Sequence, residues 1–127
     1  MFVTHIYFNG NCKEAIQLYV KAFGATVKII IQNPEKDNLV EHAEIYIHNQ
    51  LLMLNDFGNN DGYSRSGGYQ LTVSFENEEA LKQAYSILED GSTAISPMQA
   101  ADYSPCIVRF TDKYDIRWAF WVHSETD

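Results

Sequence analysis

Hydrophobic and polar residues alternate along several short segments of the chain, a pattern typical of half-buried β-strands. In the first segment, residues 2–8, the side chains of Val3, His5 and Tyr7 share one face, and apolar residues and Thr4 occupy the other. The same pattern, or a short run of β-favouring residues, predicts further strands at 26–32, 40–48, 51–55, 69–75, 92–95, 106–111 and 116–122. Residues between 95 and 106, including two prolines, are predicted to form a loop.

Two segments have the 3.6-residue period of amphipathic helices. The first follows Asn11, a predicted N-cap with Glu14 as its capping-box partner, and it ends at Gly24. The second follows Asn77 and ends at Gly91. The two predicted apolar faces consist of Ala15, Ile16, Tyr19, Val20 and Phe23, and of Ala80, Leu81, Ala84, Tyr85 and Leu88.

The second half of the chain repeats the first. A shift of 65 residues carries the first apolar helix face onto the second, and it carries 51–55 onto 116–120. The order βαβββ therefore occurs twice. We predict one α+β domain over 1–127, with modules at 1–56 and 69–122 and a Gly-, Asn- and Ser-rich linker at 57–68. The two sheets are expected to form a cupped, strongly curved mixed sheet with the helices on its outer face, which is a natural small-molecule site.

Composition narrows the possible partners. The 127 residues are 46% hydrophobic and carry a formal net charge of −8, which argues against nucleic acid because phosphate binding needs clustered Lys and Arg. No apolar run approaches the length of a membrane span. Cys12 and Cys106 form no CxxC motif, and they are expected to be reduced thiols of a cytoplasmic protein.

Four stretches resemble the PhnB-like branch of the vicinal oxygen chelate superfamily, which includes glyoxalase I, bleomycin resistance proteins and extradiol dioxygenases. They are FNGNCKEAIQLYVKAFGA (8–25), HAEI (42–45), LLMLND (51–56) and TDKYDIRW (111–118). The resemblance implies paired βαβββ modules of the glyoxalase/bleomycin resistance fold and a homodimer. This chain departs from the related sequences at QAADYSPC (99–106), where they carry a TFWG-like stretch, and at Asp115, where they have glycine.

Metal-using members of the superfamily place their ligands on the first and last strands of each module. The 65-residue shift assigns these positions to His5 and Gln70, and to Leu54 and Ala119. Leucine and alanine side chains cannot ligate a metal, and a catalytic site needs about three N or O donors. We therefore expect a cup without a well-formed catalytic metal.

An alternative stays open from the sequence. His42 and Glu44 share a strand face, and with His5 they could hold Zn, Ni, Mn or Fe in a metal-dependent lyase, isomerase or dioxygenase. In the simpler interpretation, either His5 and Glu44 form a hydrogen-bonded polar pair, or His42 and His48 face solvent.

We expect the cup to bind a small polar or anionic molecule. Arg109 is the repeat counterpart of Glu44, and the two could pair with each other, hold a ligand or be exposed charges. The predicted ligand-binding residues are His5, Tyr7, Glu44, Gln70, Thr72, Arg109, Arg117 and Trp121. No GxSxG, HExxH or dinucleotide-binding glycine motif is present, and a Cys106–His pair stays open.

Overall fold

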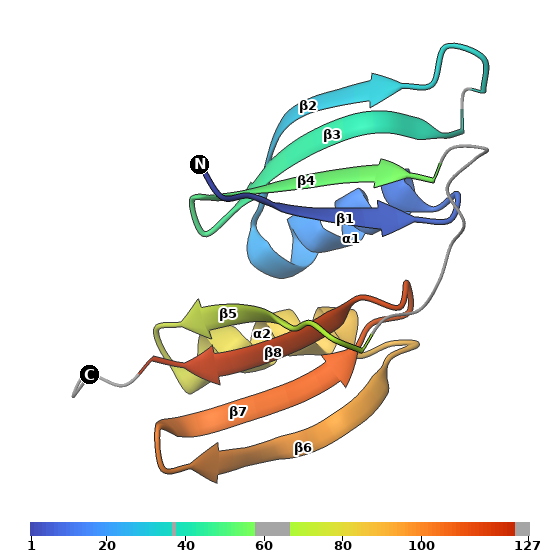
Figure 1. Cartoon of the computed structure of the whole chain (residues 1–127). Helices are drawn as coiled ribbons and strands as arrows, with labels where there is room; N and C mark the ends of the chain where they lie inside the picture. The colour runs from blue at the N-terminus through green and yellow to red at the C-terminus, as the bar shows by residue number, and fades with distance from the viewer. Residues whose placement is uncertain (37, 58–66, 124–127) are drawn as a thin grey trace. The chain divides into compact units, whose positions relative to one another are not determined.

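The computed structural model describes residues 1–36, 38–57 and 67–123, and it divides the chain into two compact units, 1–64 and 65–127 (Figure 1). Each unit contains one helix and four strands in the order βαβββ, which confirms the predicted repeat and the α+β class. Apart from Phe57, Gly67 and Gly68, the predicted linker lies outside the described residues.

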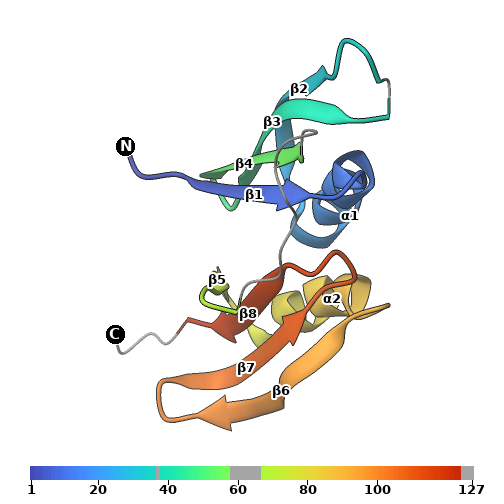
Figure 2. The ribbon, with the colours of Figure 1, turned by 45° about the vertical axis from the view of Figure 1, so that its right-hand side comes forward.

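The first unit is a four-stranded sheet with order β1-β4-β3-β2 and a helix on one face (Figure 2). β1 is parallel to β4 and the other pairings are antiparallel, so the sheet is mixed. The helix buries Ala15, Ile16 and Tyr19 on the side that contacts β3 and β4. The elements are β1 (Thr4–Phe8), α1 (Cys12–Phe23), β2 (Thr26–Gln32), β3 (Val40–Ile47) and β4 (Gln50–Asp56).

The second unit has the same topology, with strand order β5-β8-β7-β6. α2 buries Leu81, Ala84 and Leu88, and it contacts β5 and β8, the latter containing the buried Trp118 and Phe120. The elements are β5 (Leu71–Phe75), α2 (Glu78–Leu88), β6 (Thr93–Ala101), β7 (Ser104–Thr111) and β8 (Arg117–Val122). The predicted loop after residue 95 is wrong, because β6 continues through Pro97. Proline is tolerated there because β6 is an edge strand.

The N-terminus of α1 is held by a carboxylate from a distant part of the sequence. Asn11 occupies the N-cap position, as predicted, but its side chain makes no capping hydrogen bond. Instead, Oδ1 of the buried Asp56 accepts from the backbone N–H groups of Gly10 (2.8 Å) and Cys12 (3.1 Å). Oδ2 accepts from the N–H of Val40 at 2.8 Å. One side chain therefore joins the ends of β4, α1 and β3.

In α2 the predicted cap is confirmed. Oδ1 of Asn77 accepts a hydrogen bond from the N–H of Ala80 at 2.8 Å. In the turn before β8, Asp115 adopts φ +68°, a left-handed conformation that glycine adopts most easily and aspartate tolerates. Its N–H donates to the carbonyl oxygen of Asp112 at 2.9 Å, so the turn closes with aspartate in the glycine position.

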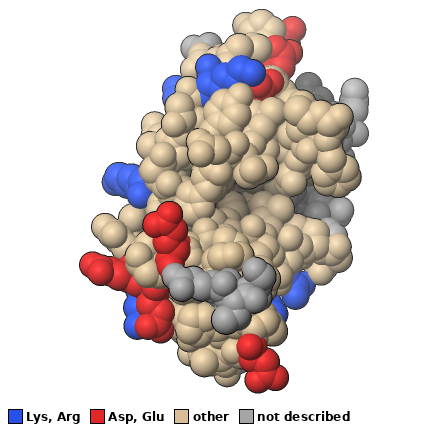
Figure 3. Space-filling model, turned by 90° about the vertical axis from the view of Figure 1, so that its left-hand side faces the viewer, with Lys and Arg blue, Asp and Glu red and all other residues tan. Residues whose placement is uncertain are grey.

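The distribution of basic side chains and the length of the helices agree with what the composition predicts. On the face of the molecule drawn in Figure 3, Lys and Arg side chains do not gather into a patch, and uncharged side chains cover most of the area. No helix in the described part of the chain is long and apolar enough to cross a membrane.

We predict that Asp56→Asn lowers the free energy of unfolding by about 2–3 kcal/mol. The amide keeps one acceptor oxygen, but its NH₂ group replaces the other oxygen and faces a backbone N–H donor that is left without an acceptor. Asp90→Asn removes an exposed carboxylate and is the matched control, with an expected change within about 0.5 kcal/mol. Urea unfolding measures both. Equal stability of the two variants would contradict the anchoring role of Asp56.

Candidate functional site

In each unit, the sheet face opposite the helix carries the predicted site residues, and we call it the open face. On the first sheet, cross-strand pairing places His5 beside Met53, and Met53 beside Glu44. Tyr7 pairs with Asn55 in the next row. His5, Tyr7, His42 and Glu44 are therefore brought to one open face, as the alternation of the sequence predicts.

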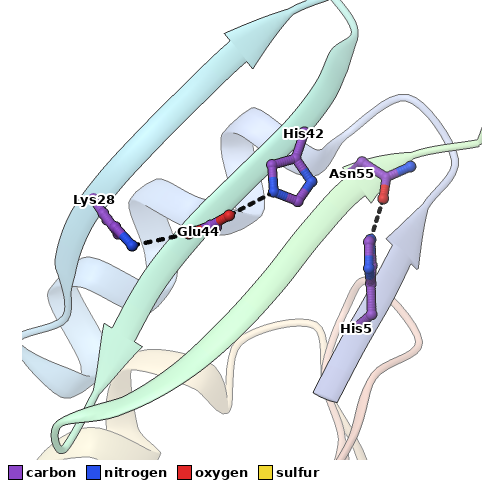
Figure 4. Close-up of polar contacts among 5 residues, drawn as sticks. All are labelled: His5, Lys28, His42, Glu44 and Asn55. Atoms are coloured by element: carbon purple, nitrogen blue, oxygen red, sulfur yellow. Dashed lines mark hydrogen bonds and ion pairs between the residues drawn. The ribbon is translucent and has the colours of Figure 1, made fainter. Parts of the chain in front are cut away.

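Five side chains on this face form two polar groups (Figure 4). His5 Nε2 hydrogen-bonds Oδ1 of Asn55, which comes from the neighbouring strand β4. His42 Nε2 lies 2.8 Å from Oε2 of Glu44, and Lys28 Nζ lies 3.4 Å from Oε1. The hydrogen bond from His42, together with the Lys28 ammonium, lowers the pKa of Glu44 below its usual range. Glu44 is therefore an ionised acceptor with two partners, and neither of them is His5.

Apolar and aromatic side chains surround these polar groups. The His5 ring stacks on Tyr7 with ring centroids 4.8 Å apart, and Tyr7 lies beside Phe57 at 5.1 Å. Along β2, Ile29 pairs with Glu44 and Ile31 with His42 on the same face. The open face of the first unit is thus part polar and part aliphatic.

The residues proposed for a metal are only partly brought together. The His5 and His42 ring centroids are 6.0 Å apart, and His42 and Glu44 bond to each other. Among residues 1–36, 38–57 and 67–123, no group of three His, Cys, Asp or Glu side chains is placed to hold one ion. The donor set in this arrangement does not match the three-ligand requirement of a catalytic metal.

The strand register changes the repeat counterpart of His5. In the first unit, a row across the sheet runs His5–Met53–Glu44, and in the second unit the matching row runs Thr72–Ala119–Arg109. His5 therefore corresponds to Thr72, which lies 67 residues later, and the assignment of Gln70 by a constant shift is wrong. Glu44 and Arg109 do correspond, as predicted.

The same register corrects the last-strand positions. Leu54 pairs with Ile6 on the helix side of the sheet and is fully buried, so it does not share a face with His5. Met53 occupies the last-strand position beside His5, and Ala119 occupies the matching position beside Thr72. Methionine and alanine add no carboxylate or imidazole to this row.

The open face of the second unit has a different chemistry. The Arg109 guanidinium donates from Nη2 to the Tyr103 hydroxyl at 3.1 Å, and the Tyr103 ring lies 5.6 Å from Trp121. Trp121 Nε1 donates to Oγ of Ser74 at 2.6 Å. The arrangement is one cation beside two aromatic rings, with hydroxyl groups on the neighbouring strand.

Three other predicted residues lie at the start of the strands of the second unit, namely Gln70, Thr72 and Arg117. Gln70 Nε2 donates to Oγ1 of Thr72 at 3.2 Å, so both belong to this face. Arg117 donates from Nη1 to the carbonyl oxygen of Gly67 at 2.9 Å, which assigns it a role in holding the chain before β5. Trp118 is buried and donates from Nε1 to Asp112 at 2.9 Å, as a core residue.

Sequence reasoning missed several residues of the two faces. Asn55 could have been found, because it is two residues from Met53 and alternation places both on one face. Lys28 could not, because it reaches Glu44 next to a register shift between Val27 and Ile29 that alternation does not reveal. Tyr103 lies in QAADYSPC (99–106), where this chain departs from the related sequences, and it is not among the predicted site residues.

Neither cysteine has the surroundings of an activated nucleophile. Both are free and buried. Burial, followed by the charge of Asp56, raises the pKa of the Cys12 thiol to about 12. Burial also raises the pKa of Cys106, and the nearby Glu78 adds to the effect. A nucleophilic cysteine needs a lowered pKa, so these thiols have the properties of core residues.

We predict that neither thiol reacts within minutes with Ellman's reagent at pH 8 in the folded protein. At a pKa of about 12, roughly one Cys12 thiol in ten thousand is ionised at this pH, against about a quarter for an ordinary cysteine. Both thiols should react fully in guanidinium chloride. Ser86→Cys adds an exposed thiol on α2 and should react at once. Rapid reaction of an unmodified chain would contradict the core role.

Known structures share this fold. No protein-family model and no curated protein sequence matches the chain. Protein PA1353 from Pseudomonas aeruginosa superposes with a TM-score of 0.88 and 21% identity, over 97% of each chain. A PhnB protein from Bacillus cereus, provisionally named a 3-demethylubiquinone-9 3-methyltransferase, gives 0.86 and 23%, over 95% of this chain and 98% of the other.

A glyoxylase/bleomycin resistance protein/dioxygenase domain from Frankia sp. EAN1pec is also similar. It superposes with a TM-score of 0.72 and 17% identity, over 98% of this chain and 91% of the other. These likenesses confirm the glyoxalase/bleomycin resistance fold that the sequence motifs imply.

Proposed function

We propose that the chain is a PhnB-like protein of the vicinal oxygen chelate superfamily that binds a small polar or anionic molecule. We assign the binding atoms to the open faces of the two sheets. The fold shared with a PhnB protein and the four sequence stretches from residue 8 to residue 118 support this assignment. We place the protein in the cytoplasm, where two unpaired cysteines stay reduced.

The observation that carries the proposal is that Arg109 has a hydrogen-bond partner but no carboxylate partner among the described residues. Its guanidinium donates to a neutral hydroxyl, that of Tyr103, and within the described ranges it forms no ion pair with a carboxylate. A guanidinium has five N–H donors in a planar fork, and carboxylates and phosphates match that geometry. Arg109 therefore has donors and charge available for an anionic group.

The surroundings of Arg109 suit a ligand that is more than a bare anion. Trp121 is half-buried and is held by Ser74, so its ring is oriented before a ligand binds. Tyr103 is exposed and adjoins both Arg109 and Trp121. We assign the anionic group of the ligand to Arg109 and a flat or apolar part to the two rings.

The first open face complements this arrangement. Lys28 offsets the charge of Glu44, so these side chains give this face little net charge. His5 and Asn55 provide hydrogen-bonding atoms on neighbouring strands, and Tyr7 provides an exposed ring. We assign the polar, uncharged part of the ligand to this face.

We predict that some small carboxylates, phosphates or phosphonates raise the melting temperature of the protein, and that Arg109→Gln weakens their binding about 10- to 100-fold. A charge-assisted hydrogen bond is worth about 1.5–3 kcal/mol, which sets this range. Calorimetry with the best compound of the panel measures the change. Lys82→Gln, an exposed lysine on α2, is the control and should bind as the unmodified protein does. Equal affinities in all three proteins would remove Arg109 from the site.

A metal-dependent lyase, isomerase or dioxygenase is the second candidate function. The 6.0 Å separation of the His5 and His42 rings and the adjacent Glu44 carboxylate favour it. A rotation of one imidazole would be needed before both rings could bind a single ion.

Metal analysis separates the two candidates. We expect protein purified without chelator, and protein reloaded with Zn, Ni, Mn or Fe, to retain far less than one ion per chain, because the row beside His5 lacks further ligands. Elemental mass spectrometry measures the content. About one ion per chain, lost in His5→Ala but kept in His48→Ala, would favour the metal-dependent enzyme over the metal-free binding protein.

A further inference from the structure

The edge strand of the first sheet is exposed on both of its faces. β2 is the last strand in the order β1-β4-β3-β2 and pairs only with β3 within its sheet (Figure 1). All seven of its residues are exposed, and Val27, Ile29, Ile30 and Ile31 are each 37–41% accessible. A long aliphatic edge of this kind offers free backbone N–H and C=O groups to another strand.

The equivalent edge of the second sheet is protected. β6 occupies the same place in the order β5-β8-β7-β6, but it contains Pro97 and three shifts of register along its pairing with β7. Ile95 is its one large exposed aliphatic residue among those described. β2 also has register shifts, but it contains no proline, and proline lacks the backbone N–H that an added strand would pair with. The two edges therefore differ in Pro97 and in the number of exposed aliphatic residues.

A groove runs beside β2, on the helix side of the sheet. Its volume is about 450 Å³, and its floor is formed by Ile16 and Val20 of α1 with Val27 and Ile30 of β2. Lys13 and Lys21, both exposed, also line it. The two lysines are eight residues apart on the helix, or about 12 Å along its axis. The groove is thus apolar at its base and basic at both ends.

We propose that β2 and this groove bind an extended acidic segment of another protein, which adds a strand to the sheet. Main-chain hydrogen bonds to the β2 edge supply part of the affinity, and alternate side chains enter the groove. Acidic residues four positions apart in a strand lie about 13 Å apart on one face, which matches the spacing of the lysines. The residue midway between them is apolar and contacts Val27 and Ile30.

Charge favours this partner over a second copy of the chain. Pairing of β2 with β2 of another copy would bring the lysines of both grooves to one joint surface, where they repel. An acidic segment instead neutralises Lys13 and Lys21. The net charge of −8 on the whole chain does not prevent this contact, because charges beyond about 8 Å are largely screened at physiological ionic strength.

The probe for the test is the end-blocked heptapeptide Ser-Asp-Thr-Val-Thr-Glu-Ser, with Ser-Lys-Thr-Val-Thr-Lys-Ser as its charge-reversed control. Titration into the ¹⁵N-labelled full chain should shift the amide signals of residues 26–32 and of α1. The acidic peptide should bind at least tenfold more tightly than the basic one, and its affinity should fall as salt is added.

Three variants make the test specific. Lys21→Glu should weaken binding of the acidic peptide at least tenfold, and Ile30→Lys, at an exposed position, should abolish the shifts along β2. Lys82→Glu makes the same charge change on α2 and should leave binding unchanged. Well-dispersed spectra of each variant report that it is folded.

Several results would overturn the proposal. They are the absence of shifts along β2, shifts confined to another surface, equal binding of the two peptides, and equal binding by Lys21→Glu and Lys82→Glu. Sedimentation of the protein alone distinguishes self-association. A dimer that Ile30→Lys dissociates, with no binding of the acidic peptide, would assign this edge to a second copy of the chain.

Discussion

The fold of the first unit depends on one buried carboxylate, that of Asp56. It accepts backbone hydrogen bonds from Gly10, Cys12 and Val40, so it fixes the start of α1 and the start of β3 against the end of β4. Burial of a charge is costly unless such donors surround it. The preceding residue, Asn55, donates to the backbone carbonyl oxygen of Asp56 and hydrogen-bonds His5, so the polar contacts of the open face begin beside the anchor in sequence.

The second unit reaches the same fold with other polar contacts. Asn77 caps α2, and the buried Asp112 accepts from Tyr114, Ile116 and the Trp118 indole. The two modules therefore share backbone topology and the position of their apolar helix faces, and they differ in their polar side chains. The open faces differ in the same way, with Glu44 in one and Arg109 in the matching position of the other. A repeat preserves the shape of a site more readily than its chemistry.

The sequence predicted the helices, most strands and the equivalence of Glu44 and Arg109, because these depend on local periodicity. The sequence-based predictions failed where the register of the repeat depends on loop length, and where a helix terminus is held by a residue far along the chain. The second module has two residues fewer than the first between the end of its first strand and its helix face, so a constant shift paired His5 with Gln70 instead of Thr72. Asn11 has the residue type of a cap, but a carboxylate far along the chain performs that role.

The two open faces differ in how far their charged side chains are neutralised by neighbours. Glu44 has Lys28 and His42 as partners, whereas the matching Arg109 has only the Tyr103 hydroxyl within the described residues. An anion gains more beside a cation that has no counter-charge than beside a neutralised pair. The row His5–Met53–Glu44 is therefore electrostatically balanced by Lys28, whereas the row Thr72–Ala119–Arg109 keeps an uncompensated positive charge within the described residues. The repeat thus gives two open faces with the same backbone arrangement and unequal electrostatic character.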